Sequence, residues 1–217
     1  MMLRTLALAI SLLLSFISTA AIAQDSDTCE LHVWPTSSFF AVYHGASGAW
    51  GGGLVMTLTP MQAVAKRLGE SIDPGAQVEL IRSLNLDEDE RFQGYRLIFH
   101  EVPSTPKYSN WIAKDVGAGN RDTGSRSQCY AELHVVFITL FRTAISKKIQ
   151  TGFLFRQFGS SSEMTYKAVD AGSTGAPDFK TNSDEKSEAA RLSARLAFQE
   201  NLRIFLKGKN MRSDRLR

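Results

Sequence analysis

Two segments of the chain begin with a cysteine, share the string Glu-Leu-His-Val and alternate polar with apolar side chains. They are residues 29–34 (CELHVW) and residues 129–135 (CYAELHV). Successive side chains of a β-strand point to opposite faces, so each cysteine falls on the apolar face of its strand. If the strands are neighbours, the two sulfur atoms can come within bonding distance. These segments therefore predict two strands of one sheet, joined by a disulfide.

The N-terminus has the three parts of a secretory signal peptide. Arg4 supplies a positive charge, residues 6–17 are apolar, and residues 21–23 (Ala-Ile-Ala) match the small-x-small cleavage pattern. The apolar segment is shorter than the roughly 20 residues that a membrane-spanning helix needs. We therefore expect residues 1–23 to be removed on export, which leaves a mature chain in an oxidising compartment where disulfides persist.

Cys29 is also the residue to test for lipid attachment. The polar residues Ser26, Asp27 and Thr28 precede it, where a lipid-attachment signal has aliphatic and small residues. We therefore do not expect Cys29 to carry a lipid. Two buried free thiols are the remaining alternative, and the chain has no Cys-x-x-Cys pattern typical of redox proteins. We expect a structural disulfide between Cys29 and Cys129, which would stabilise the fold by about 3–5 kcal/mol in the chain-entropy model.

The opposite faces of the same two strands carry Glu30 with His32 and Glu132 with His134. Two imidazoles and two carboxylates form a reasonable ligand set for zinc or copper. The alternative is that these side chains form the solvent-exposed polar face of a half-buried sheet. These four residues are candidates for a metal site, and nothing else in the sequence predicts a cofactor.

Periodicity and capping signals predict the remaining elements. Helices are expected to start at Thr59-Pro60, at Asp73-Pro74 and near Asn182, and strands are expected over residues 29–34, 94–102, 129–142 and 147–158. The last two strands form a long antiparallel hairpin, and residues 103–128 and 160–181 are predicted to be polar loops. We expect a single α+β domain over residues 24–206, with a mostly antiparallel sheet, helices on one face and a C-terminal helix.

Composition and motifs exclude several classes of protein. The chain has 43% hydrophobic and 22% charged residues and a formal net charge of +3, which fits a globular fold and no multi-span membrane protein. The glycine-rich run at residues 45–53 lacks the Gly-Lys-Ser/Thr ending of a phosphate-binding loop. The sequence contains no Gly-x-Ser-x-Gly, His-Glu-x-x-His or Ser-x-x-Lys motif of a hydrolase. We therefore expect no enzyme, and the export signal disfavours nucleic acid as a partner.

The C-terminal residues 207–217 form a basic tail, with five Lys or Arg residues and one Asp. Anionic lipid would attract such a tail by roughly 1 kcal/mol for each nearby charge. A peripheral contact with an anionic membrane is one interpretation, and a solvated chain end is the other.

The predicted hairpin and final helix, with Leu192, Leu196, Leu202 and Phe205, resemble the end of small bacterial envelope accessory proteins. These include auxiliary, often lipidated, components of lipid-transport systems. The strings CELHVWP and CYAEL are similar to those of exported bacterial proteins with no assigned function. The resemblance implies a non-enzymatic envelope protein that binds a protein or lipid partner through the glycine-rich run, the 103–128 loop or the final helix. A periplasmic metal-binding protein is the alternative.

Overall fold

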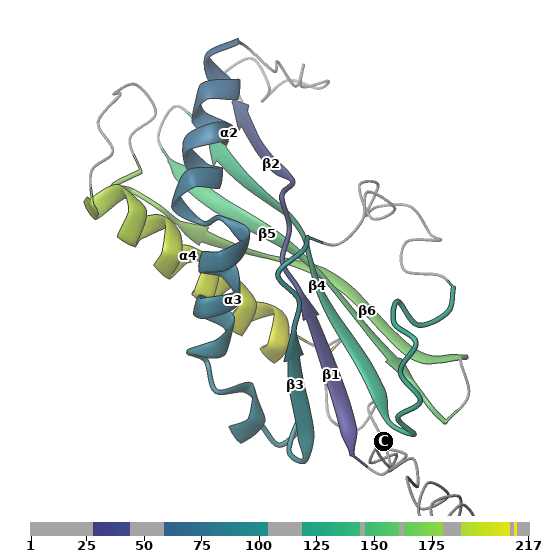
Figure 1. Ribbon diagram of the computed structural model, residues 1–217. Coiled ribbons are helices and arrows are strands. Elements are labelled where there is room, and N and C mark those ends of the chain that lie inside the picture. The colour runs from purple at the N-terminus through teal and green to yellow at the C-terminus, as the bar shows by residue number, and fades with distance from the viewer. Residues whose placement is uncertain are drawn as a thin grey trace, which may run out of the picture.

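A computed structural model of the chain describes residues 28–43, 59–103, 119–143, 146–160, 163–179, 188–208 and 211 (Figure 1). Several predicted features lie outside these residues: the signal peptide, the glycine-rich run, most of the 103–128 loop, the start of the last helix near Asn182, and most of the basic tail. None of the described helices is long and apolar enough to cross a membrane.

The described residues form one six-stranded sheet with three α-helices and a short 3-10 helix. The strands are β1 (Cys29–Trp34), β2 (Phe39–Tyr43), β3 (Tyr95–Phe99), β4 (Tyr130–Arg142), β5 (Lys147–Phe158) and β6 (Met164–Gly175). The helices are α2 (Thr59–Ser71), α3 (Pro74–Arg82), η3 (Leu86–Glu88) and α4 (Glu188–Lys207). The predicted start of α3 is confirmed, because the Asp73 carboxylate accepts a hydrogen bond from the Ala76 amide at 2.9 Å.

The sheet is mixed, so the prediction of a mostly antiparallel sheet is wrong. Its strand order is β3-β1-β4-β5-β6, and β2 pairs with β4 beyond the end of β1. The pairs β1–β3, β1–β4 and β2–β4 are parallel, whereas β4–β5 and β5–β6 are antiparallel. Parallel neighbours need a long crossover connection. The two predicted helices α2 and α3 lie between β2 and β3 in the chain and provide one.

Strands β2 and β6 were not predicted from the sequence, and β6 is the longer of the two. Residues 160–181 were expected to form a polar loop, but Met164–Gly175 pairs with β5 along its whole length, from Met164 opposite Phe158 to Gly175 opposite Lys148. Its fully buried positions are Ala168 and Gly172. Side chains this small leave no apolar alternation in the sequence, which explains why the strand was missed.

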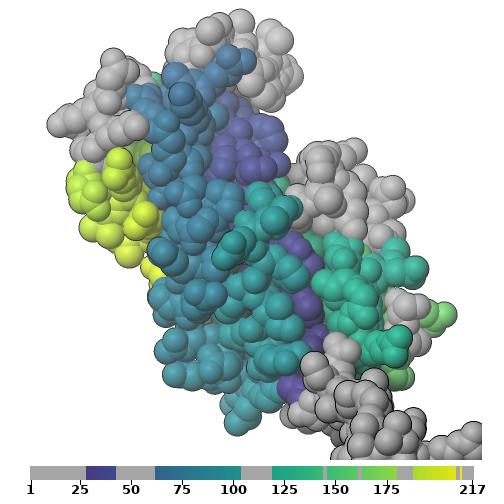
Figure 2. Space-filling model, in the orientation of Figure 1, coloured from purple at the N-terminus to yellow at the C-terminus, as the bar shows by residue number. Residues whose placement is uncertain are grey.

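The hydrophobic core lies between one face of the sheet and the helices, which cross that face in Figure 1. Leu31 of β1, Leu133 of β4 and Phe153 of β5 belong to the same buried cluster as Leu68 of α2 and Phe198 of α4. The prediction that the helices cover one face of the sheet is therefore confirmed. In the space-filling view, β1 shows only as a narrow purple strip between the chain segments on either side of it (Figure 2).

Candidate functional site

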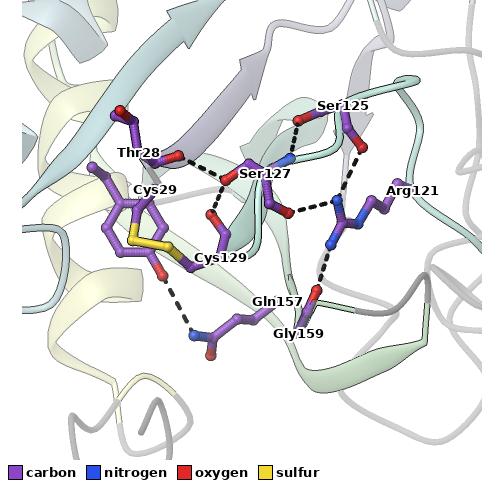
Figure 3. The surroundings of a disulfide bond; sticks show 9 residues. Thr28, Cys29, Arg121, Ser125, Ser127, Cys129, Gln157 and Gly159 are labelled. Atoms are coloured by element: carbon purple, nitrogen blue, oxygen red, sulfur yellow. Dashed lines mark hydrogen bonds between the residues drawn. A yellow bond between two sulfur atoms is a disulfide. The ribbon is translucent and has the colours of Figure 1, made fainter. Parts of the chain in front are cut away.

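The predicted disulfide between Cys29 and Cys129 is present, and it ties the first residue of β1 to the residue before β4 (Figure 3). The two Cα atoms are 4.7 Å apart, within the ordinary range for a disulfide. The Ser127 hydroxyl lies beside the bond, 2.7 Å from the carbonyl oxygen of Thr28 and 3.0 Å from that of Cys129. The disulfide is therefore set in a hydrogen-bonded junction between the two strands.

Arg121 extends this junction to a third strand. Its guanidinium donates to the carbonyl oxygens of Ser125 at 3.0 Å and Ser127 at 2.9 Å, and also to that of Gly159 after β5 (Figure 3). The same guanidinium lies over the Tyr130 ring, with 4.8 Å between its central carbon and the ring centroid. The described end of the 103–128 loop is thus pinned to the sheet.

The polar faces of β1 and β4 are buried, so the prediction of an exposed polar face is wrong. The exposed fractions are 6% for Glu30, 5% for His32 and zero for both Glu132 and His134. The described part of the 103–128 loop lies over them, since the Asp122 amide donates to the Glu132 carboxylate at 2.6 Å. Buried ionisable groups are costly unless they are paired, so their partners decide what they can do.

The two Glu-Leu-His-Val strings are neighbours but lie two residues out of step. The parallel register of β1 and β4 places His32 beside Glu132 and Trp34 beside His134. Each histidine bonds the glutamate of its own strand: the Nε2–Oε2 distance is 3.1 Å for His32 and Glu30, and 3.3 Å for His134 and Glu132. The four predicted metal ligands therefore form two separate pairs.

The pair on β1 continues into a chain of hydrogen bonds. The Glu30 carboxylate accepts from the Ser125 hydroxyl and from the Arg96 guanidinium. On its other side, His32 Nδ1 lies 2.9 Å from His100 Nε2. Because the carboxylate is acceptor-only, His32 donates from Nε2 and accepts at Nδ1, and His100 must donate from Nε2. The hydrogen-bond partners thus fix the tautomers of both rings.

The pair on β4 has an internal counter-ion. The Arg156 guanidinium of β5 forms ion pairs with the Glu132 carboxylate and with Asp122, at 2.9 Å from Asp122 Oδ1. The Tyr130 hydroxyl also donates to Glu132 Oε1 at 2.8 Å. Arg156 and Glu132 are both fully buried. Glu132 and Arg156 in the middle of the sheet thus form a charged cluster with Asp122 of the loop above them, whose side chain is 13% exposed.

Aromatic rings join the two pairs. The Trp34 indole lies between the imidazoles of His100 and His134, with centroids 4.0 and 4.6 Å away and planes within 6° of parallel. The His32 ring lies 4.8 Å from the Tyr130 ring. The sequence pattern predicts no functional role for His100, Trp34, Tyr130 or Arg156.

The surroundings of these groups set their charge. Burial lowers the pKa of the His134 imidazole and outweighs the Glu132 carboxylate, which raises it. Burial also lowers the pKa of His32 and of His100. For Glu30, burial raises the pKa, but hydrogen bonds from Ser125, His32 and Arg96 outweigh it, and the pKa lies below its usual value. At neutral pH the histidines are neutral and Glu30 is ionised.

Only part of the predicted metal set converges. Among the described residues, one ligand atom each from Asp122, Glu132 and His134 lie within 4.8 Å of one another. His134 Nε2 is 3.3 Å from Glu132 Oε2 and 3.7 Å from Asp122 Oδ2. Ligands of a tetrahedral zinc ion with bonds of 2.0–2.1 Å are about 3.4 Å apart. The guanidinium of Arg156 bonds both carboxylates, however, so a metal ion would have to displace it.

A second candidate site is a groove between α4 and the end of β6. It encloses about 470 Å³, and its lining residues are Thr174, Gly175, Pro177, Asp178, Ala189, Leu192, Ser193, Leu196, Ala197, Glu200 and Arg203. Leu192 and Leu196 are each 54% exposed. They lie one helical turn apart and so share one side of α4. The final helix was one of the three predicted binding surfaces.

Comparison with known proteins finds distant backbone similarity only. No protein-family model and no curated protein matches the chain. A hypothetical protein from Chlamydia trachomatis is 9% identical with a TM-score of 0.32, and the match covers 83% of this chain and 98% of that one. A lipoprotein from Neisseria meningitidis is 10% identical with a TM-score of 0.29, over 79% and 97%. A protein from Helicobacter pylori, described as a neuraminyllactose-binding hemagglutinin homolog, is 10% identical with a TM-score of 0.31, over 86% and 87%. These values are too low to assign a family or a function.

Proposed function

We propose that this protein is a non-enzymatic, exported protein of the bacterial cell envelope that binds a protein or lipid partner in the groove between α4 and β6. The observation that carries the proposal is the pair Leu192 and Leu196, which are half exposed and line a concave surface. A single exposed leucine needs no explanation. Two on the same side of a helix, both lining a groove, are typical of a binding surface.

The energetics favour a partner at this groove. Burying apolar surface stabilises a complex by about 25 cal/mol for each Å² removed from water. Leu192 and Leu196 belong to α4, and the opposite side of this helix, which includes Ala194 and Phe198, is fully buried in the core. The core therefore holds α4 in place, and binding would not cost the conformational entropy of ordering this helix.

The buried histidines and glutamates support a non-enzymatic role. Glu30, His32, Glu132 and His134 are hydrogen-bonded to one another and to their neighbours, and all four are at most 6% exposed. A general acid or base must reach the proton that it transfers. The disulfide supports export, because such bonds persist in oxidising compartments and are rare in the cytosol.

Site-specific photo-crosslinking in cells tests the proposal. A photoreactive amino acid at position 196 should give a discrete crosslinked product, whereas the same amino acid at position 204 should not. Ile204 is a matched control, because it lies on the same helix, is 41% exposed and does not line the groove. Crosslinking at neither position, or equally at both, would contradict binding at the groove. Fractionation of the same cells tests export.

A second candidate function is metal binding at Asp122, Glu132 and His134, which the spacing of their ligand atoms favours. Metal analysis of the purified protein after dialysis tests it. About one zinc or copper ion for each chain, lost in the Asp122→Asn variant, would support it. A metal content well below one ion for each chain would remove it.

A further inference from the structure

We infer that the groove takes an extended segment of another protein, which adds as a strand to the open edge of β6 and carries apolar and basic side chains. This inference rests on the proposed function and names the chemistry of the partner. It follows from the shape of the groove, the free edge of the sheet and the charges around it.

The shape follows from a close contact between helix and strand. At Gly172 the backbone of β6 touches α4: a Cβ atom placed there would lie 2.3 Å from the Asn201 carbonyl oxygen. Most of the lining residues precede Asn201 on α4 and follow Gly172 on β6. The groove therefore lies mostly to one side of this contact, which closes one of its ends. An extended segment lying along β6 would fit such a groove.

Strand β6 has an unpaired edge beside the groove. It is the last strand of the sheet, and no described strand pairs with its outer side. The amides and carbonyls of an edge strand are a template for an added strand, and peptide-binding domains use them in this way. A bound backbone would supply hydrogen-bond partners for the amides and carbonyls of this edge.

The charges of the groove favour a basic protein segment over an anionic lipid. Its lining contains two carboxylates, Asp178 and Glu200, and one guanidinium, Arg203. Arg203 already pairs with Glu200 at 3.4 Å. Asp178 has no ion-pair partner among the described residues. An anionic headgroup would meet net negative charge here, whereas a Lys or Arg side chain would find Asp178.

Selection from a library of random peptides displayed on phage, with the purified protein as target, tests the inference. We expect the selected peptides to have apolar residues at every second position and to contain Lys or Arg. A synthetic peptide of the selected sequence should bind at least tenfold more weakly to the Leu196→Asp variant and unchanged to Ile204→Asp. Both positions are exposed, so both variants should fold, which thermal unfolding would check. Asp178→Asn should weaken binding several-fold, with a reduced salt dependence.

The added strand has its own test. Methylation of alternate backbone amides of the peptide should abolish binding at the positions that face β6 and leave binding unchanged at the positions between them. Binding that tolerates every methylation, or a selection that returns acidic peptides, would overturn the inference. So would Leu196-dependent binding of phosphatidylglycerol vesicles without any selected peptide. In each of these cases a crosslink at position 196 but not at position 204 would leave the proposed function standing.

Discussion

The same tetrapeptide, Glu-Leu-His-Val, occurs in β1 and in β4 and meets two different environments. In β1, Glu30 pairs with Arg96, whose side chain is 57% exposed, and His32 reaches His100 at the end of the edge strand β3. In β4, the glutamate pairs with the fully buried Arg156. The local sequence and the parallel orientation are identical, so the difference arises from position: β1 lies one strand from the edge of the sheet and β4 lies in its middle.

This comparison shows how a sheet assigns roles to identical side chains. Water can replace the outer partners of the β1 pair, because Arg96 is largely exposed and His100 is only half-buried. The β4 pair cannot, since a buried charge that loses its counter-ion has no water to replace it. The β1 cluster is therefore expected to be tolerant and sensitive to conditions, and the β4 cluster intolerant and structural.

The largest effect is expected from removing the bond that holds the two strings together. In the Cys29→Ser, Cys129→Ser double variant, the loss of a link across 100 residues should lower the free energy of unfolding by about 4–5 kcal/mol. Urea unfolding of the variant and of the reduced wild-type protein measures this loss. Similar unfolding curves with and without the disulfide would mean that the register of β1 and β4 is held by the sheet alone.

The next largest effect is expected in the β4 cluster. Arg156→Met removes the guanidinium and leaves Glu132 and Asp122 without their cation, at a cost of about 3–5 kcal/mol for an uncompensated buried charge. Chemical denaturation measures the loss. The double variant Arg156→Met, Glu132→Leu should recover part of it, because both charges are then gone. A single variant as stable as the wild-type protein would contradict the assignment of Arg156 as the counter-ion.

Lowering the pH should destabilise the folded protein in two steps, first through the buried histidines of both clusters and then through Glu30. The pKa values of His32, His100 and His134 lie below the usual 6.5 in the folded protein, because burial disfavours the charged imidazole. The unfolded chain therefore takes up protons below about pH 6.5 that the folded chain does not, and stability falls as the pH falls. Glu30, with its lowered pKa, adds a further loss below about pH 4.5. Thermal unfolding between pH 7 and about pH 3 measures both steps.

A matched variant separates the histidines from the other groups. His100→Gln keeps a hydrogen-bonding side chain but removes one titrating ring, so its stability should depend less steeply on pH between 7 and 5. An unchanged slope would show that His100 does not contribute to the acid sensitivity.

The smallest effect is expected from Arg96→Met, the counterpart of Arg156→Met in the β1 cluster. Because Arg96 is largely exposed, its ion pair with Glu30 should contribute about 0.2–1 kcal/mol. The same denaturation experiment measures it. A loss as large as that of Arg156→Met would erase the distinction between the two clusters.

The sequence predicted those parts of the molecule in which side-chain alternation is visible. The β1, β4 and β5 strands, the disulfide and the helices starting at Thr59 and Asp73 follow from local pattern and capping chemistry. Strand β6 was missed because its inward positions are Ala168 and Gly172, which carry no hydrophobic signal. The parallel pairings were missed because orientation depends on the crossover connections, which a strand's own residues do not encode.

The site was predictable only in part for a related reason. The strings located Glu30, His32, Glu132 and His134, but the two-residue offset between the strands follows from the register of the whole sheet. Asp122 and Arg156 come from a loop and from the hairpin's second strand, with no motif linking them to β1. Long-range register, rather than residue chemistry, decides which side chains meet.

The position of the disulfide has a mechanical consequence. Cys29 is the first residue of β1, and Cys129 immediately precedes β4. A pulling force applied through the N-terminal segment would reach the S–S bond at the first residue of β1, and this bond would carry part of the force directly into the middle strand of the sheet. The hydrogen bonds between β1 and its two parallel neighbours would then carry less of the shear. The groove between α4 and β6 lies two strands beyond β4 in the sheet, so it lies outside this path of force.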